Sequence, residues 1–177
     1  CVRTLRFTAP VLQVQFSPSS SRTLLAVLES REAFLVRFPS WEDVQSTTMS
    51  TEPRRIALHG TPDTSAACFT PDGLWILTGS VKGVIRLVDG QDGRLVHELP
   101  CQIGASMIRE IVLDEQSRHV AVNMNDRTVR TLRVSYNDGC EMPTGLTPTH
   151  KFQDLVSRTP WSGIGFSRGA EYVIGGA

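Results

Sequence analysis

Histidine and cysteine are the side chains of this 177-residue chain that most often bind metals or act as bases and nucleophiles. The four cysteines form no CxxC pair, and none has a histidine at metal-ligand spacing. Cys68 lies in the apolar stretch 66–69 and is expected to be buried as a small hydrophobic residue. The histidines are scattered over different predicted strands and turns, and each is expected to be a strand-edge residue: His59, His97, His119 and His150.

Motifs for known reaction types are also missing. The sequence has no GxSxG nucleophile elbow, no HExxH helix and no phosphate-cradling glycine loop. Residues 89–93 look like a calcium loop, but the Glu required at its twelfth position is absent, which favours a hairpin turn. We therefore predict a protein with no catalytic residue, no metal site and no cofactor.

Arginine is the remaining residue type with a clear chemical use. The chain has 16 Arg and only 2 Lys against 18 acidic residues, so its formal charge is zero. This balance argues against a uniformly basic nucleic-acid binder but allows a local basic patch. Arg127 and Arg158 fall in predicted surface loops, where an arginine is ordinarily solvated or paired with an acid. The alternative is a contact with phosphate, which the forked guanidinium group suits.

The elements that carry these loops follow a repeat. Four times, a short apolar strand ends in a bulky residue and is followed by a polar turn and a second apolar strand. The bulky residues, at positions 16, 69, 113 and 166, are 53, 44 and 53 residues apart. A β-rich repeat of about 40–50 residues is typical of propeller blades, each a four-stranded antiparallel sheet. The predicted strands are 11–16, 24–28, 33–37, 54–58, 65–69, 74–78, 84–88, 95–99, 108–113, 119–123, 128–134, 150–152, 161–166 and 171–175.

This pattern predicts an all-β fold, a partial WD-repeat β-propeller of about three and a half blades. Residues 1–177 are expected to be a fragment of a single propeller. No run of 18 apolar residues is present, so no membrane partner is expected. The predicted blade-like repeats lie at about 6–60, 61–106, 107–156 and 157–177, and residues 1–5 are expected to be the last strand of a preceding blade.

Strand direction assigns the loops to two faces of the propeller. Polar insertions at 40–53 and 135–148 separate the predicted third and fourth strands, so both are expected on one face. Loops between second and third strands, and loops linking one blade to the next, emerge on the opposite face. Arg127 and Arg158 are therefore expected on that opposite face, on adjacent blades. Asp126 stands where WD-repeat blades keep a structural turn aspartate, and Lys82 takes the equivalent position in the preceding repeat.

One block of the sequence is more specific than the general repeat. Residues 150–161, together with 171–176 and 6–15, resemble the retinoblastoma-binding protein 5 family and its fungal counterpart, the WD-repeat subunit of COMPASS. The resemblance extends along the whole chain in order, although Ser157 replaces the usual Asn. The residues that carry it best are Gln153, Asp154, Arg158, Pro160 and Trp161.

The resemblance implies a non-catalytic scaffold in the nucleus. Members of the family belong to complexes that methylate lysine 4 of histone 3, where they hold the SET-domain methyltransferase with other COMPASS core subunits. The implied partners are these subunits and the nucleosome, both histones and DNA backbone, with no small-molecule substrate. Family members use loop arginines against nucleosomal DNA, and two of those positions match Arg127 and Arg158.

Two other functions remain compatible with the repeat pattern. The first is a WD-repeat adaptor of another complex, such as a substrate receptor of a ubiquitin ligase or a transport subunit. The second is an enzyme on a β-propeller, which would need convergent acids or a metal cluster that the sequence does not show. The block at 153–161 favours the chromatin scaffold over both.

Overall fold

The computed structural model describes residues 4–39, 54–58, 63–137, 142–153, 156 and 159–176. Regular structure in these ranges is entirely β, and no helix there is long and apolar enough to cross a membrane. The strands are β1 (Val11–Ser17), β2 (Ser20–Leu28), β3 (Ala33–Arg37), β4 (Arg54–Ala57), β5 (Thr64–Phe69), β6 (Trp75–Ser80), β7 (Ile85–Asp89), β8 (Leu95–Leu99), β9 (Ile108–Leu113), β10 (His119–Met124), β11 (Thr128–Tyr136), β12 (Pro143–Gln153), β13 (Gly163–Phe166) and β14 (Val173–Gly176).

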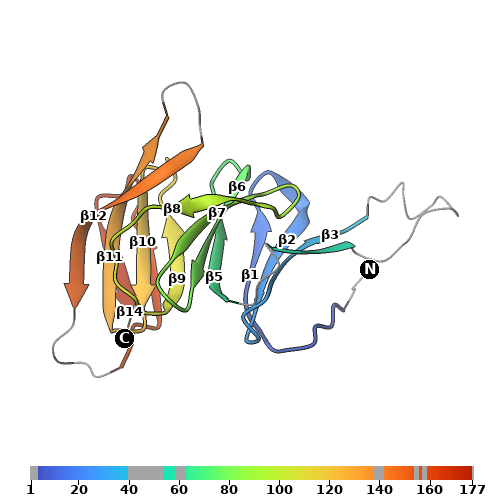
Figure 1. The fold of residues 1–177 in the computed structure, drawn as a ribbon, viewed down its shortest axis with the longest axis horizontal. Coiled ribbons are helices and arrows are strands. Elements are labelled where there is room, and N and C mark those ends of the chain that lie inside the picture. The colour runs from blue at the N-terminus through green and yellow to red at the C-terminus, as the bar shows by residue number, and fades with distance from the viewer. Residues whose placement is uncertain are drawn as a thin grey trace, which may run out of the picture.

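These strands form sheets that follow one another along the chain. Three sheets have four strands, in the orders β1-β2-β3-β4, β5-β6-β7-β8 and β12-β11-β10-β9, and β13 pairs with β14. Every pairing is antiparallel between sequence neighbours, and Figure 1 shows the sheets side by side. The first strand of each sheet contacts the first strand of the next, because β5 meets β1 and β9, and β9 meets β13. This arrangement confirms the strand pattern predicted from the repeat.

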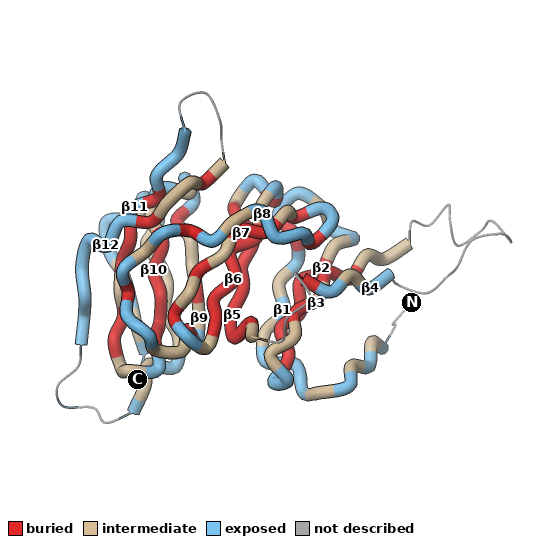
Figure 2. The backbone as a smooth tube through the Cα atoms, in the orientation of Figure 1, coloured by how far each residue is buried: buried red, intermediate tan, exposed pale blue. Residues whose placement is uncertain are grey.

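The core lies between neighbouring sheets. One apolar cluster joins the β5–β8 sheet to the β9–β12 sheet, and a second joins it to the β1–β4 sheet. The middle strands are therefore buried on both faces, as the red segments of Figure 2 show. Full burial of one such Leu or Ile side chain stabilises the fold by about 1.5–3 kcal/mol. Cys68 belongs to this core as predicted, and burial raises the pKa of its thiol.

Polar side chains link each first strand to the next at their edges. The Gln15 side-chain oxygen accepts a hydrogen bond from Phe69 N–H at 3.0 Å. Ser65 Oγ donates to Ile108 O at 2.6 Å. Glu110 Oε2 accepts from Ile164 N–H at 2.9 Å. In all three junctions the side chain comes from the earlier sheet and reaches the backbone of the following one.

The prediction of a polar insertion at 135–148 was largely wrong. β11 continues to Tyr136 and β12 begins at Pro143, so most of the segment is a paired hairpin that extends past the neighbouring sheets in Figure 1. The predicted fourth strand at 150–152 is only the end of β12. Two contacts accompany the extension: Leu146 N–H donates to Pro100 O at 3.1 Å, just after β8 of the neighbouring sheet, and Tyr136 Oη donates to Ser117 O in the β9–β10 turn of its own sheet. The insertion predicted at 40–53 lies outside the described residues.

Candidate functional site

The β10–β11 turn carries Asp126 and Arg127. The Asp126 carboxylate accepts hydrogen bonds from the Thr128 backbone N–H at 3.2 Å and from Thr128 Oγ1 at 2.5 Å. Its second oxygen forms an ion pair with the Arg130 guanidinium at 3.3 Å. The carboxylate thus holds the turn closed, and Arg130 compensates its charge.

Arg127 occupies the left-handed position of this turn. Its φ is 64°, and its N–H donates to Met124 O at 3.2 Å. Two other second-to-third-strand turns have the same form: Arg31 has φ 68° and Gly83 has φ 79°, each with the equivalent backbone bond. A residue other than glycine at positive φ costs about 1 kcal/mol or more. The Arg127 side chain is half-buried and has no ion-pair partner among the described residues.

Trp161 clamps this turn from the next sheet. Its indole Nε1 donates to the Arg127 carbonyl oxygen at 3.3 Å. The Trp161 carbonyl oxygen in turn accepts a bond from Asn123 Nδ2 at 2.9 Å. A Cβ at Gly175 would lie 2.4 Å from Cε3 of Trp161, so only glycine allows the ring to sit there. Trp161 therefore fixes the backbone from which the Arg127 side chain projects.

The structure brings together two of the residues singled out in the sequence, Arg127 and Trp161, through that indole bond. Pro160 precedes Trp161 and is half-buried. Gln153 is exposed at the end of β12, where its register partner is Thr128. Arg158 and Asp154 lie outside the described residues, so their predicted roles stay predictions.

Sequence reasoning missed Asn123 and Gly175, the two residues that seat Trp161. Asn123 is only 1% exposed, although it is a polar residue on a strand. An Asn within an otherwise apolar strand pattern is the signal that could have found it, because buried amides need hydrogen-bond partners. Gly175 gave no signal, since the glycine pair at 175–176 is equally compatible with a turn.

Glu110 lies beside this surface on β9. It is half-buried, and burial raises the pKa of its carboxyl above the ordinary value, while the bond from Ile164 N–H opposes that shift. The carboxylate is committed to the junction between β9 and β13. Its side chain also lines a cavity with Arg31 and Arg109.

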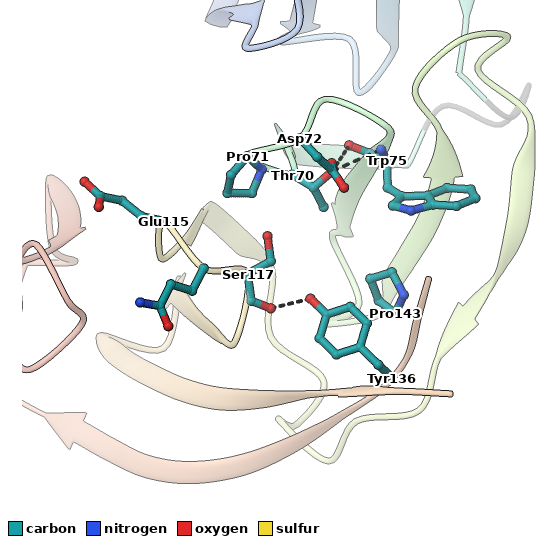
Figure 3. A pocket seen from close by; sticks show the side chains of 9 residues that line it. Thr70, Pro71, Asp72, Trp75, Glu115, Ser117, Tyr136 and Pro143 are labelled. Carbon is teal, nitrogen blue, oxygen red and sulfur yellow. Dashed lines mark hydrogen bonds between the residues drawn. The ribbon is translucent and has the colours of Figure 1, made fainter. Parts of the chain in front are cut away.

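A cavity of about 370 Å³ lies away from this turn and is shown in Figure 3. The β5–β6 turn, the β9–β10 turn and the loop end of the β11–β12 hairpin (Tyr136 and Pro143) form its walls. Thr70 Oγ1 donates a hydrogen bond to Asp72, and Tyr136 Oη donates one to Ser117 O. None of the site residues predicted from the sequence lines it. In the described ranges, no group of three or more His, Cys, Asp or Glu residues could hold a metal ion.

Comparison with known proteins identifies relatives in one group, although no protein-family model matches the chain. The chain is 25% identical over 182 residues to COMPASS component SWD1 of Saccharomyces cerevisiae, covering 98% of this chain and 41% of that protein. It is 29% identical over 181 residues to the retinoblastoma-binding protein 5 homolog of Drosophila melanogaster, covering 97% of this chain and 34% of that protein. It is 32% identical over 111 residues to Set1 complex component swd1 of Schizosaccharomyces pombe, covering 63% of this chain and 26% of that protein.

The fold agrees with these relatives. The β-propeller domain of Cps50 (Swd1) from Myceliophteria thermophila matches with a TM-score of 0.78 and 27% sequence identity, over 97% of this chain and 54% of that chain. This match confirms the predicted all-β, partial β-propeller. The chain spans about a quarter to two fifths of the length of the curated relatives. The resemblance seen in the sequence is therefore confirmed, because the chain is similar in sequence and fold to the Swd1 and retinoblastoma-binding protein 5 proteins.

Proposed function

We propose that this chain is part of a non-catalytic scaffold subunit of a COMPASS-type histone 3 lysine-4 methyltransferase complex. In this role it helps to assemble the SET-domain enzyme with the other core subunits in the nucleus, and it docks the complex on the nucleosome. The relatives named as COMPASS and Set1 complex components support the scaffold role. The repeats at about 6–60, 61–106, 107–156 and 157–177 are then blades of one propeller, and residues 1–5 are the last strand of a preceding blade of that propeller.

The observation that carries the docking role is the clamped turn of Arg127. A guanidinium group binds phosphate oxygens with two parallel hydrogen bonds, and such contacts depend on a fixed geometry. The Trp161 indole and the Asp126 carboxylate both restrain the backbone of this turn. The side chain is thus presented on a rigid support, with Asp126 already paired to Arg130. We assign Arg127 as a contact to the DNA backbone, and Arg158 as a second contact by resemblance.

The test uses the full-length protein reconstituted with its complex and with nucleosomes. In the first arm, Arg127→Gly is combined with Arg158→Ala, and nucleosome affinity and lysine-4 methylation are measured. Glycine suits the positive φ of residue 127, so this substitution removes the guanidinium without straining the turn. We expect the affinity to fall and its salt dependence to weaken, because about one counterion is released for each phosphate contact.

Arg31→Gly is the matched control. Arg31 occupies the same turn position with nearly the same φ, but Glu29 and Glu32 flank it in the chain. Its removal should leave nucleosome affinity unchanged. Unchanged affinity in the Arg127→Gly/Arg158→Ala protein would overturn the DNA contact and leave the scaffold role standing. Failure of the full-length protein to copurify with the other core subunits would overturn the scaffold role.

A further inference from the structure

The cavity of about 370 Å³ between the β5–β8 and β9–β12 sheets has no assigned role. One of its walls is the β9–β10 turn, which lies at the other end of β10 from the turn of Arg127. The cavity is therefore on the opposite face of the row of sheets from the proposed DNA contacts. Any ligand that it binds is separate from the nucleosomal DNA discussed above.

Ring side chains from three segments meet in this cavity. Trp75 is half-buried and packs against the core cluster, while Tyr136 at the end of β11 is 37% exposed. Flat, stiff rings of this kind form slots that accept the proline rings of a ligand, because they lose little conformational freedom on binding. The ring-bearing residues of the lining are Pro71, Trp75, Tyr136 and Pro143.

Hydrogen bonds already fix the turns that hold these rings, as Figure 3 shows. Thr70 Oγ1 donates to Asp72 Oδ1 at 2.5 Å and accepts from Trp75 N–H at 3.0 Å. Tyr136 Oη donates to Ser117 O, which ties the hairpin to the β9–β10 turn. A ligand therefore meets walls that are in place before it binds, and this lowers the entropy cost of association.

The indole N–H of Trp75 has no acceptor. Nε1 is buried, and it has no hydrogen-bond partner in the part of the chain that the structure describes. The edge of the ring that carries Nε1 faces Pro143, another residue of the cavity wall, in Figure 3. Buried indole N–H groups are ordinarily paired. A carbonyl oxygen entering the cavity beside Pro143 would supply the missing acceptor.

The charged side chains of the lining are both acids. The Asp72 carboxylate is held by Thr70, whereas Glu115 is exposed and makes no ion pair within the described ranges. None of the described residues that line the cavity is a lysine or an arginine. The charge of the lining therefore favours a ligand with a basic side chain over an acidic one.

We propose that this cavity binds an extended, proline-containing segment of a partner protein, with a lysine or arginine beside the proline. A chain in the polyproline II conformation makes no internal hydrogen bonds, so its carbonyl oxygens can accept the Trp75 indole N–H. Its proline rings lie against Tyr136 and Pro143, and its basic side chain reaches Glu115. Aromatic-lined grooves select this conformation because it is stiff before binding. The inference does not depend on the DNA contact of Arg127.

The experiment measures binding of fluorescein-labelled synthetic peptides to the full-length protein by fluorescence anisotropy. Three peptides of equal length are built from repeating Pro-Pro-Lys, Pro-Pro-Glu and Ala-Ala-Lys units. The Pro-Pro-Lys peptide should bind most tightly. The Pro-Pro-Glu peptide keeps the conformation but reverses the charge, and the Ala-Ala-Lys peptide keeps the charge but loses the polyproline conformation, so both should bind more weakly.

Two changes to the protein test the named contacts. Replacing Trp75 with benzothienylalanine keeps the ring and puts sulfur in place of the N–H, and Glu115→Gln removes the charge. Each should weaken binding of the Pro-Pro-Lys peptide by about 3- to 10-fold, the effect of one lost hydrogen bond. Glu29→Gln is the control, because Glu29 is exposed just after β2, on the face opposite the cavity. It should leave the affinity unchanged.

The outcomes decide for or against the peptide site. Weaker binding in both cavity variants, with Glu29→Gln unchanged, supports it. Wild-type affinity in either cavity variant overturns it, as does failure of the Pro-Pro-Lys peptide to bind. Equal binding of the Pro-Pro-Lys and Ala-Ala-Lys peptides also overturns it, because charge alone then attracts the peptide. Thermal unfolding of each variant is recorded alongside, and a loss of affinity confined to a destabilised variant counts against the site.

Discussion

At the residue scale, Arg127 holds a backbone conformation that glycine adopts at lower cost. The neighbouring sheet uses Gly83 at the same turn position, with φ 79°, so the turn itself does not require arginine. The arginine therefore adds a charged side chain at the expense of about 1 kcal/mol of backbone strain. Arg31 carries the same strain with φ 68°, so the backbone conformation by itself does not distinguish Arg127 from its control.

Glu110 provides a prediction at the same scale. Burial raises the pKa of its carboxyl above the unfolded value of 4.5, so the folded state binds this proton more tightly than the unfolded state. The stability contributed by the protonated group is complete below pH 4.5 and is lost as the pH rises through the raised pKa. Glu110→Gln should therefore raise the free energy of unfolding near pH 7, because Gln keeps an oxygen for Ile164 N–H without the charge.

Urea unfolding of the full-length protein at neutral pH and below pH 4.5 checks this expectation. The difference between Glu110→Gln and wild type should disappear at the lower pH, where both states of the wild type are protonated. The control is Glu115→Gln, a substitution at an exposed position, which should leave the free energy of unfolding as in wild type at both pH values. A Glu110→Gln protein that is less stable than wild type at neutral pH would contradict the assignment.

At the element scale, the β10–β11 turn depends on β13 and β14 for its position. Trp161, just before β13, bonds the turn, and Gly175 on β14 leaves room for the ring. The turn that presents Arg127 is thus completed by the following sheet. Changes in β14 should reach the proposed DNA-contact surface, although none of its residues belongs to that surface.

Gly175→Ala tests this dependence. The added methyl group would approach Trp161 to 2.4 Å and displace the ring, which should lower stability by about 1–3 kcal/mol and weaken DNA binding. Gly165→Ala on β13 is the matched control, because nothing lies within 4 Å of its Cβ. Trp161→Phe keeps an aromatic ring but removes the indole donor and makes the side chain smaller, and it should weaken DNA binding more than it lowers the melting temperature. Equal behaviour of the two glycine variants in melting and binding experiments would contradict the clamp.

The sequence allowed prediction of the elements but only part of the site. Alternating apolar residues and Pro, Asp, Ser and Gly turns placed most strands close to their observed positions, because each sheet is built from sequence neighbours. The β11–β12 hairpin was missed, since its pairing depends on contacts such as Leu146 with Pro100 in another part of the chain. The Trp161–Arg127 bond joins residues 34 positions apart, and no local pattern encodes it.

At the scale of the whole molecule, apolar side chains are exposed at both ends of the row of sheets. Leu12, Val14 and Phe16 on β1 are 55%, 60% and 58% exposed, and Tyr172 and Ile174 near β14 are each 68% exposed. Most of the large side chains between these ends are packed against a neighbouring sheet. Exposed apolar strand faces with free edges are typical sites of association.

The 177-residue chain on its own is therefore expected to self-associate. Size-exclusion chromatography over a range of protein concentrations should show species larger than a monomer of 19.5 kDa. Val14→Lys combined with Phe16→Ser should shift the elution toward the monomer, because it breaks the apolar stripe of β1. Lys151→Ser, at an exposed position on the outer strand β12, is the control. A concentration-independent monomer for the wild-type chain would contradict this expectation.

The side-chain bonds at the sheet junctions have a consequence for how the molecule loses its structure. Gln15, Ser65 and Glu110 each tie one sheet to its immediate successor, and none of these bonds reaches beyond the adjacent sheet. Cooperativity is then a nearest-neighbour property, as in linear repeat proteins. Damage at one junction weakens the two sheets that share it and leaves more distant junctions intact.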